Sequence, residues 1–285
     1  MGLITMTNNL VRDLRKKSAE LRLEIINMIF RAKKGHIGGA YSCLDLMVCL
    51  YYGNVLNISP DSQHEIERDI FILSKGHSGI AQYVILADLG FFSKNELQNF
   101  NHEGSFLGEH PDKNIPGIEA DTGSLGHGLG IAVGFAFASK IGQIKRNIYV
   151  IVGDGECYEG TVWESMLFAN HHNLDNLTII VDRNYQITLD FTEECNSLDP
   201  LNKKFESFGM NIFTTEGHDH AEILKTLQKV NQNKNGKPNL ILANTIKGKG
   251  VSFMEGKLKW HHGLPNEEEK NIALEELNKE LQLYV

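Results

Sequence analysis

The segment from Ile148 to Asn184 constrains the fold of this chain more than any other part of the sequence. An apolar run that begins at Ile148 leads directly into a Gly-Asp-Gly turn centred on Asp154. A helix-like stretch follows, and a second apolar run that begins at Leu177 leads to Asn184. Adjacent strands of a parallel sheet place their C-terminal ends side by side, at the crevice where ligands bind. The segment therefore predicts a strand–helix–strand unit of a parallel α/β sheet, with Asp154 and Asn184 at one site.

The residues at these strand ends suit a magnesium ion and a diphosphate group. Mg²⁺ prefers a few protein oxygens and completes its octahedron with phosphate oxygens and water, so the Asp154 carboxylate and the Asn184 amide oxygen are suitable ligands. Gly153 and Gly155 let the backbone approach a phosphate, and the helix start that follows offers free N–H groups. The competing interpretation is a structural turn in which Asp154 only caps a helix.

Helical and strand patterns alternate along the rest of the chain. This alternation predicts an α/β fold with a parallel sheet and helices on both faces, within a single domain over residues 1–285. Ser42 is predicted to cap a helix that starts at the next residue, and the segments 101–127 and 185–199 are predicted to be loops. The remaining helices are expected at 10–33, 79–89, 128–141, 200–208, 221–231 and from 266 onward, and the remaining strands at 69–73, 211–214 and 239–245.

Composition excludes several classes of protein. The chain has 285 residues and a net charge of −8, which opposes binding to nucleic acid. The start of the chain lacks a signal-peptide pattern, and no run of eighteen apolar residues predicts a membrane span. The four cysteines form no C-x-x-C pair, so we expect reduced, mostly buried thiols in a cytoplasmic protein.

Four further loops place histidine beside glycine or proline. They contain His36, His77, His110 and the pair His261-His262, and the last pair follows a Lys-Gly-Lys-Gly run that begins at Lys247. A single loop histidine is usually a solvated or capping residue. Histidine nevertheless suits proton transfer near neutral pH, and the order and spacing of these loops favour a shared site.

Together these motifs resemble those of the transketolase family over nearly the whole chain. The resemblance rests on the Gly-Asp-Gly and Asn pair, on the histidine loops, on the Lys247 segment and on a T-G-x-L-G-x-G segment that begins at Thr122. It implies the thiamine-diphosphate-binding fold, here the diphosphate-binding domain. It also implies thiamine diphosphate with Mg²⁺ as cofactors, or Ca²⁺ or Mn²⁺ in place of Mg²⁺.

The resemblance assigns a role to each matching position. Asp154, Asn184 and the backbone carbonyl of Gln186 would hold the metal ion, and Glu159 would reach a neighbouring subunit. The catalytic histidines would be His36, His77, His110 and His262, where His262 is favoured but His261 stays open. The cofactor would contact His77, Gly123, Ser124, Leu125, Gly153, Asp154, Gly155, Glu156, Asn184, Gln186, Lys247 and His262.

Four residues depart from the family pattern. Leu189 and Asp190 replace the expected Asp-Gly after the metal-binding Asn, so that loop is expected to have another shape. Lys75 stands where Asn is common, and Glu109 replaces Gly before His110. These changes are expected to bring an amine and a carboxylate to the substrate mouth, which leaves the substrate open.

The chain is considerably shorter than a full-length member of the family. The half that would carry the catalytic glutamate, the aromatic platform and the sugar-phosphate arginines has no counterpart here. The resemblance therefore implies the N-terminal subunit of a split transketolase, which transfers a two-carbon ketol unit from a ketose or ketose phosphate to an aldehyde. It would need a separate C-terminal subunit, and a dimer of heterodimers is the expected assembly.

Three alternatives remain open at this point. The first is the E1 component of a 2-oxo acid dehydrogenase, which would share the site centred on Asp154 but lack the histidine loops. The second is a split enzyme that resembles deoxyxylulose-phosphate synthase, or a specialised ketol or acyl transferase. The third is a non-catalytic assembly subunit, which the intact Asp154, Asn184 and histidine set disfavours.

Overall fold

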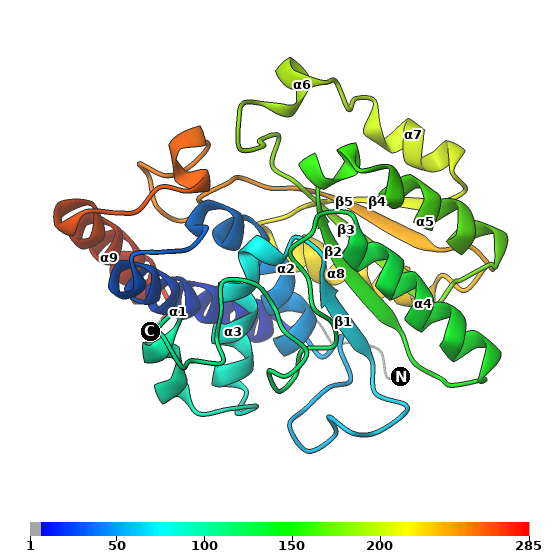
Figure 1. Ribbon diagram of the computed structural model, residues 1–285, viewed down its shortest axis with the longest axis horizontal. Coiled ribbons are helices and arrows are strands. Elements are labelled where there is room, and N and C mark those ends of the chain that lie inside the picture. Colours follow the sequence, from blue (N-terminus) through cyan, green and yellow to red (C-terminus); the bar gives the residue numbers. More distant parts are fainter. Residues whose placement is uncertain (1–6, 285) are drawn as a thin grey trace.

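The computed structural model describes residues 7–284, and its centre is a five-stranded parallel sheet in the order β1-β2-β3-β5-β4 (Figure 1). Gly153 pairs with Asp182 in the register of β2 and β3, so the two ends that carry Asp154 and Asn184 lie next to each other, as predicted. The strands are β1 (Ile70–Leu73), β2 (Ile148–Gly153), β3 (Leu177–Arg183), β4 (Asn211–Glu216) and β5 (Asn239–Asn244).

Helices cover both faces of the sheet, which confirms the predicted architecture (Figure 1). One side carries α1 (Asn8–Ala32), α2 (Ile37–Tyr52), α3 (Gly79–Asp88), α8 (His220–Gln232) and α9 (Glu267–Gln282). The other side carries α4 (His127–Ile141), α5 (Gly160–His171) and α7 (Leu201–Ser207). Short helical turns complete the chain: η1 (Gly76–Ser78), η2 (Lys94–Asn99), η3 (Gly155–Tyr158), α6 (Thr192–Cys195) and η4 (Leu258–His261).

The sheet separates two hydrophobic cores. In β2, Tyr149 and Ile151 belong to the core with α1, α2 and α3, whereas Ile148, Val150 and Val152 belong to the core with α4 and α5. Successive side chains of a strand point to opposite faces, and both faces are buried here. This is why the strands read as continuous apolar runs in the sequence.

The predicted start of α2 is wrong. The helix begins at Ile37, so Ser42 lies inside it and donates a hydrogen bond from Oγ to Asp182 Oδ2 (2.6 Å). The glycines before Ser42 suggested a loop, but they serve close packing within the helix. A Cβ on Gly38 would lie 2.6 Å from the Trp260 carbonyl oxygen. The short helix α6 was also missed, in a segment predicted to be a loop.

Three cysteines are buried and Cys195 is exposed, as expected. Among the described residues, no helix is long and apolar enough to cross a membrane. The expected absence of a signal peptide concerns a segment that starts at residues 1–6, outside the described part of the chain.

Candidate functional site

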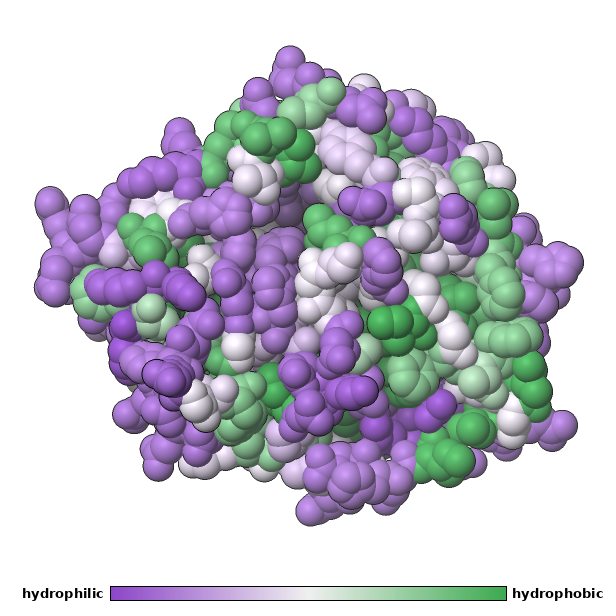
Figure 2. Space-filling view, in the orientation of Figure 1, coloured by the Kyte–Doolittle hydropathy of each residue, from purple (hydrophilic) through white to green (hydrophobic). Residues whose placement is uncertain are grey.

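A cavity of about 440 Å³ lies at the C-terminal ends of β1, β2 and β3. In the same orientation as Figure 1, Figure 2 shows this face of the molecule hollowed near its centre. Most of the predicted site residues line the cavity, although they come from loops spread over the whole chain. The lining residues from that set are His36, His77, Gly123, Leu125, Gly153, Asp154, Gly155, Glu156, Glu159, Asn184, Gln186, Lys247 and His262.

Two predicted residues do not line the cavity. His110 and Ser124 are both exposed side chains. His110 nevertheless stays beside the cavity, because a Cβ on the lining residue Gly123 would lie 2.9 Å from His110 Cδ2. Gly123 has φ +144°, a conformation that glycine adopts readily and other residues avoid. The pair therefore forms part of the cavity edge.

Asp154 is held rigidly at the end of β2. Its Oδ1 accepts a hydrogen bond from the Gly155 N–H (2.8 Å), and its Oδ2 accepts one from the Tyr185 N–H (2.6 Å). The Arg183 guanidinium also reaches Oδ2 at 3.3 Å. Burial, followed by repulsion from Asp182, raises the pKa of Asp154 to about 6, while Arg183 opposes this shift. A cation bound at this carboxylate would favour its ionised form again.

Asn184 and Gln186 line the same cavity as Asp154. Asn184 Nδ2 donates to Asp182 Oδ2 (3.2 Å), and its Oδ1 accepts from the Gln186 N–H (3.2 Å). The Gln186 carbonyl, predicted as a metal ligand, accepts a hydrogen bond from Lys247 Nζ (2.9 Å). A carbonyl oxygen has two lone pairs, so this contact still leaves one for a cation.

This donor set fits a hard cation and the phosphates attached to it. Carboxylate, amide and carbonyl oxygens come from Asp154, Asn184 and Gln186, and Gln186 Oε1 is buried without a hydrogen-bond partner. The floor is also glycine-shaped, because a Cβ on Gly155 would lie 2.4 Å from Ile187 Cγ2. Lys247 is buried nearby, and burial, followed by the neighbouring Lys75 charge, lowers its pKa to about 8. An anionic ligand would find an amine close to the cation site.

Glu156, which was expected to contact the cofactor, lines the cavity, and its carboxylate is hydrogen-bonded within the protein. Oε1 accepts hydrogen bonds from Ser74 Oγ and from the Gly126 N–H, the latter at 2.8 Å, and Oε2 accepts one from the Gly153 N–H (3.0 Å). These bonds connect the end of β1, the loop before α4 and the end of β2. Glu156 therefore braces three cavity walls against one another.

Lys75, which was expected at the substrate mouth, lines the cavity, but its side chain is buried there rather than exposed at the opening. Its Nζ forms an ion pair with Asp182 Oδ2 and donates a hydrogen bond to the Gly39 carbonyl (3.0 Å). The fold buries this amine because Asp182 provides its counter-charge. Asp182 also accepts hydrogen bonds from Ser42 and Thr245, so its carboxylate is fully used in contacts within the protein.

Histidine rings crowd one end of the cavity. His36 lies 5.3 Å from His77, 5.6 Å from His261 and 4.4 Å from His262, measured between ring centroids. Burial, and then the positive charges nearby, lowers the pKa of His36 to about 4 and that of His261 to about 3. Burial and Lys75 lower the pKa of His77 well below its usual value. These three rings are neutral at pH 7 and can accept hydrogen bonds or protons.

Both histidines of the late pair reach the cavity, which the sequence left open. His261 is the inner residue: its Nδ1 lies 2.9 Å from Lys247 Nζ and its Nε2 lies 3.0 Å from Thr188 Oγ1. His262 lines the cavity as well but is exposed. Two of the residues that depart from the family pattern, Glu109 and Leu189, also lie near these histidines. Glu109 Oε1 lies 3.0 Å from His36 Nδ1, and Leu189 stands on the rim with 83% of its surface exposed.

Some lining residues were not predicted. Tyr158, Ile187 and Thr188 come from the turn after β2 and from the loop after Asn184. Their residue types carry no chemical signal in the sequence, and only the folding of that loop over the cavity brings them in. An antiparallel bridge between Gln186 and Phe191 shapes this loop.

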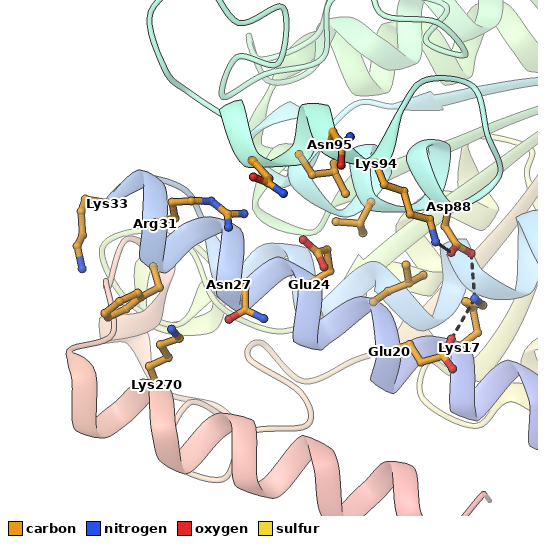
Figure 3. Close-up of a pocket in the computed structure, with 15 residues that line it drawn as sticks. Lys17, Glu20, Glu24, Asn27, Arg31, Lys33, Asp88, Lys94, Asn95 and Lys270 are labelled. Atoms are coloured by element: carbon orange, nitrogen blue, oxygen red, sulfur yellow. Dashed lines mark hydrogen bonds and ion pairs between the residues drawn. The ribbon is translucent and has the colours of Figure 1, made fainter.

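A larger hollow of about 820 Å³ lies elsewhere, between α1, α3, η2 and the start of α9 (Figure 3). Figure 3 shows Lys17 and Lys94 both directed at Asp88, in ion pairs of 2.9 Å and 2.6 Å. The hollow contains none of the predicted site residues, and four of its charged side chains, Lys17, Glu20, Asp88 and Lys94, form ion pairs with one another. Position and chemistry favour the smaller cavity as the functional site.

The chain matches the family model described as "Transketolase, thiamine diphosphate binding domain" over residues 15–279. Among curated proteins it is 42% identical over 270 residues to one subunit of the apulose-4-phosphate transketolase of Actinobacillus succinogenes, covering 94% of this chain and 97% of that one. It is 39% identical over 269 residues to the 6-deoxy-6-sulfo-D-fructose transketolase subunit SqwG of a Clostridium species, with coverage of 94% and 97%.

A solved structure gives the same picture for the fold. The transketolase of Campylobacter jejuni superposes with a TM-score of 0.86 at 31% identity, covering 96% of this chain but only 43% of the longer one. Human transketolase is 33% identical over 252 residues, which is 88% of this chain and 40% of the human chain. The chain thus spans less than half of the full-length transketolases that it resembles, and nearly all of the two separate transketolase subunits.

Proposed function

Because this chain belongs to the transketolase family, as its thiamine-diphosphate-binding domain, we propose that it is the cofactor-anchoring subunit of a split transketolase. The relatives that match it over their whole length are transketolase subunits, so the enzyme class is a transferase. They do not favour the alternatives of an E1 component or a deoxyxylulose-phosphate-synthase-like enzyme. The four thiols would stay reduced in the cytoplasm, where we place the protein.

The observation that carries this proposal is the meeting of Asp154 and Asn184 at the ends of adjacent strands, beside a glycine-shaped turn. We propose that both side chains and the Gln186 carbonyl hold Mg²⁺, or Ca²⁺ or Mn²⁺ in its place, on the diphosphate of the cofactor. When bound, thiamine diphosphate would supply the chemistry that breaks and forms a carbon–carbon bond. Lys247 would add a positive charge near the diphosphate.

The chain's own part in the reaction would be binding, orientation and proton transfer. The neutral rings of His36, His77 and His261 can accept protons from substrate hydroxyls, and Lys247 can supply one through His261 Nδ1, 2.9 Å away. His110 and His262, which are exposed at the edge, would contact the substrate as it enters. Glu159, exposed on the rim where α5 begins, would reach a neighbouring subunit.

The names of the relatives point to sugar phosphates and sulfosugars as the substrate class. We propose a ketose with an anionic group as donor and an aldehyde as acceptor. The Glu109 carboxylate beside His36 would favour the hydroxyl-rich end of the sugar and repel its anionic group. That group would then be directed toward the partner subunit.

Exposed apolar surface supports the expected partner. Ile141, Leu167 and Phe168 expose between 41% and 65% of their surface on α4 and α5, and Figure 2 shows apolar side chains gathered over these helices at the right of the molecule. Leu189 adds an exposed apolar side chain at the cavity rim. Contiguous apolar surface of this kind marks protein interfaces. We propose that a C-terminal transketolase subunit covers the cavity and that the assembly is a dimer of heterodimers.

The test is a transketolase assay with thiamine diphosphate, Mg²⁺ and phosphorylated ketoses as donors. The chain is assayed alone and co-expressed with the product of the neighbouring reading frame, as the candidate C-terminal subunit. We expect turnover only from the pair. Activity of the purified chain alone would refute the split arrangement. A pair that binds the cofactor but turns over no sugar would refute the substrate assignment and keep the site.

Asp154→Asn separates the proposed metal site from the fold. The variant keeps the shape of the side chain but loses its charge. We expect cofactor affinity in Mg²⁺ to fall at least about tenfold, because charge-assisted contacts are worth about 1.5–3 kcal/mol. Calorimetric titration of the purified pair with thiamine diphosphate measures this change. Unaltered affinity would place the metal ion elsewhere.

A further inference from the structure

We propose that His36, His261 and His262 form a second metal site in this chain, for a transition-metal cation such as Zn²⁺. One possible ligand nitrogen from each ring lies within 4.8 Å of the others. The three residues come from the start of α2 and from η4 and the residue after it, two segments that the fold brings together. They line the same cavity as Asp154 but do not belong to the oxygen site.

The spacing of the rings suits three ligands around one ion. The His36 and His262 centroids are 4.4 Å apart, and those of His261 and His262 are 4.6 Å apart. Zn²⁺ binds imidazole nitrogen at about 2.0–2.1 Å, so its ligand atoms lie about 3–3.5 Å from one another. The His36 and His261 centroids are farther apart, at 5.6 Å, so ligand nitrogens that now lie within 4.8 Å of one another must approach by up to about 1.5 Å. The exposed His262 ring can turn toward the other two rings.

The surroundings of the cluster also resemble those of a metal site. Glu109 Oε1 lies 3.0 Å from His36 Nδ1, at ion-pair distance but without hydrogen-bond geometry. A carboxylate on the outer nitrogen of a ligating histidine orients the ring and raises its basicity. The other His36 nitrogen would then be left for the ion. Glu109 also adds negative charge beside a cluster that lies close to Lys247.

His261 can bind an ion at little cost to its present contacts. Lys247 Nζ lies at its Nδ1, so Nε2 is the nitrogen to be used, and Nε2 now contacts Thr188 Oγ1 at 3.0 Å. An ion at Nε2 would break this contact. Thr188 is exposed, so its hydroxyl can then form a hydrogen bond with water. The remaining coordination positions would open into the cavity, as at zinc sites with three protein ligands.

Ligand chemistry separates this site from the magnesium site. Mg²⁺ prefers carboxylate, carbonyl and water oxygens, whereas imidazole suits Zn²⁺, Cu²⁺ and Ni²⁺. The histidine cluster should therefore stay free in excess Mg²⁺ and fill when a transition metal is added. An ion held there would occupy the place of the sugar and engage two of the proton-accepting rings. It would act as an inhibitor, and this consequence alone rests on the proposed function.

The site is tested by titrating the untagged full chain with Co²⁺ in excess Mg²⁺ and recording the visible spectrum. We expect the intense absorption of four-coordinate cobalt, saturating near one equivalent and lost when Zn²⁺ is added. His262→Ala should weaken cobalt binding more than tenfold, and Glu109→Gln about tenfold. The matched control is His171→Ala, which removes an exposed histidine at the end of α5 and should leave the titration unchanged.

Two results would overturn the proposal. One is a weak spectrum typical of six-coordinate cobalt, and the other is a four-coordinate band that survives His262→Ala. Because His262 is exposed, its replacement is expected to leave the fold intact, and circular dichroism checks this. His36→Ala provides an independent second variant at the buried end of the cluster. The cobalt titration needs neither a partner subunit nor turnover. A negative result would therefore refute the histidine metal site without bearing on the proposed transketolase function.

A second arm measures inhibition of the assembled enzyme. Zn²⁺ is added at micromolar concentration in excess Mg²⁺, and a chelator selective for transition metals is then used to reverse its effect. We expect Zn²⁺ to reduce turnover and the chelator to restore it. At zinc concentrations that do not saturate the site, the KM for the ketose should rise. Inhibition that is equally strong in the Glu109→Gln variant would place the inhibitory zinc at another site.

Discussion

At the scale of single residues, the cavity holds groups whose charged forms the fold disfavours. The pKa of Asp154 is raised to about 6, and those of His36 and His261 are lowered to about 4 and about 3. Burial is the first cause in each case, and neighbouring like charges add to it. Perturbed titrations of this kind are typical of functional sites. The sequence indicated these residue types, but burial is a property of the folded chain.

Asp154 should make the metal-free chain less stable as pH rises. Its folded pKa of about 6 lies above its ordinary value of 3.8, so the folded state retains a proton that the unfolded state has lost. The stabilisation from this group is therefore lost mainly as the pH rises from 4 to 6. Between pH 5 and pH 7, the two values to be compared, the free energy of unfolding should fall by about 1 kcal/mol. Urea unfolding at both pH values, without divalent metals, compares the wild type with Asp154→Asn.

The wild type should gain stability relative to Asp154→Asn as pH falls from 7 to 5. Added Mg²⁺ should remove much of this difference, because it stabilises the ionised carboxylate. A constant difference between the two proteins at pH 5 and pH 7 would show that Asp154 titrates normally in the folded chain.

His261 should make the chain less stable as the pH falls. This pH dependence is opposite in sign to that of Asp154. Its pKa of about 3 in the folded chain lies below the ordinary value of 6.5. Between these two pH values the ring is protonated in the unfolded chain and neutral in the folded chain. Stability is lost as pH falls from 6.5 toward 3. Allowing for screening of this partly exposed ring, the loss is about 1 kcal/mol at pH 5. His261→Asn should therefore lose less stability than the wild type between pH 7 and pH 5 in thermal or urea unfolding, and an equal loss would contradict the assignment.

At the scale of elements, the site depends on how strand ends and loops approach one another. β2 and β3 could be located from their apolar runs, and their register places Asp154 beside Asn184 as the pattern predicts. The start of α2 could not be located, because Gly38 and Gly39 read as a loop in the sequence. Their actual role is close packing against Trp260 and His77, residues that are distant in the chain.

Gly155→Ala should disturb the loop after Asn184. The added Cβ would lie 2.4 Å from Ile187 Cγ2, so the Ile187 side chain must shift. We expect cofactor affinity to fall about tenfold or more, measured by calorimetry on the assembled enzyme. The double variant Gly155→Ala with Ile187→Ala removes the clash and should recover much of the loss.

Gly134→Ala is the matched control for this substitution. It lies within α4, and a Cβ there would meet no atom within 4 Å. We expect the isolated chain to gain about 0.5–1 kcal/mol in stability, because alanine favours a helix over glycine. If Gly155→Ala binds the cofactor as well as Gly134→Ala does, the prediction is wrong, and the turn does not need glycine at position 155.

At the scale of the whole molecule, the described chain has an open cavity and an apolar face on α4 and α5. Ile141, Leu167 and Phe168 are too exposed to stabilise the isolated subunit. Buried in an interface, they would contribute about 25 cal/mol per Å² of apolar surface removed from water. A short chain with such a surface is expected to assemble.

Leu167→Asp should weaken assembly without unfolding the chain. The side chain is 57% exposed, so the charge stays solvated in the isolated subunit but would be buried in an interface. We expect light scattering after size exclusion to show smaller species, with a matching loss of activity in the pair. Ile66→Asp, at a 66% exposed residue before β1, is the control and should assemble normally. Equal assembly of both variants would exclude the α5 face.

The sequence by itself determined the alternation of helices and strands, the ends of β2 and β3, and the chemical character of Asp154, Asn184 and the histidine loops. These follow from local periodicity and residue type, which a short segment already contains. Only the tertiary structure decided that Lys75 is buried against Asp182, that Glu156 connects the ends of β1 and β2 with the loop before α4, and that the three histidines of the second metal site meet. Burial and distance depend on contacts between residues far apart in the chain, and packing of the whole fold sets them.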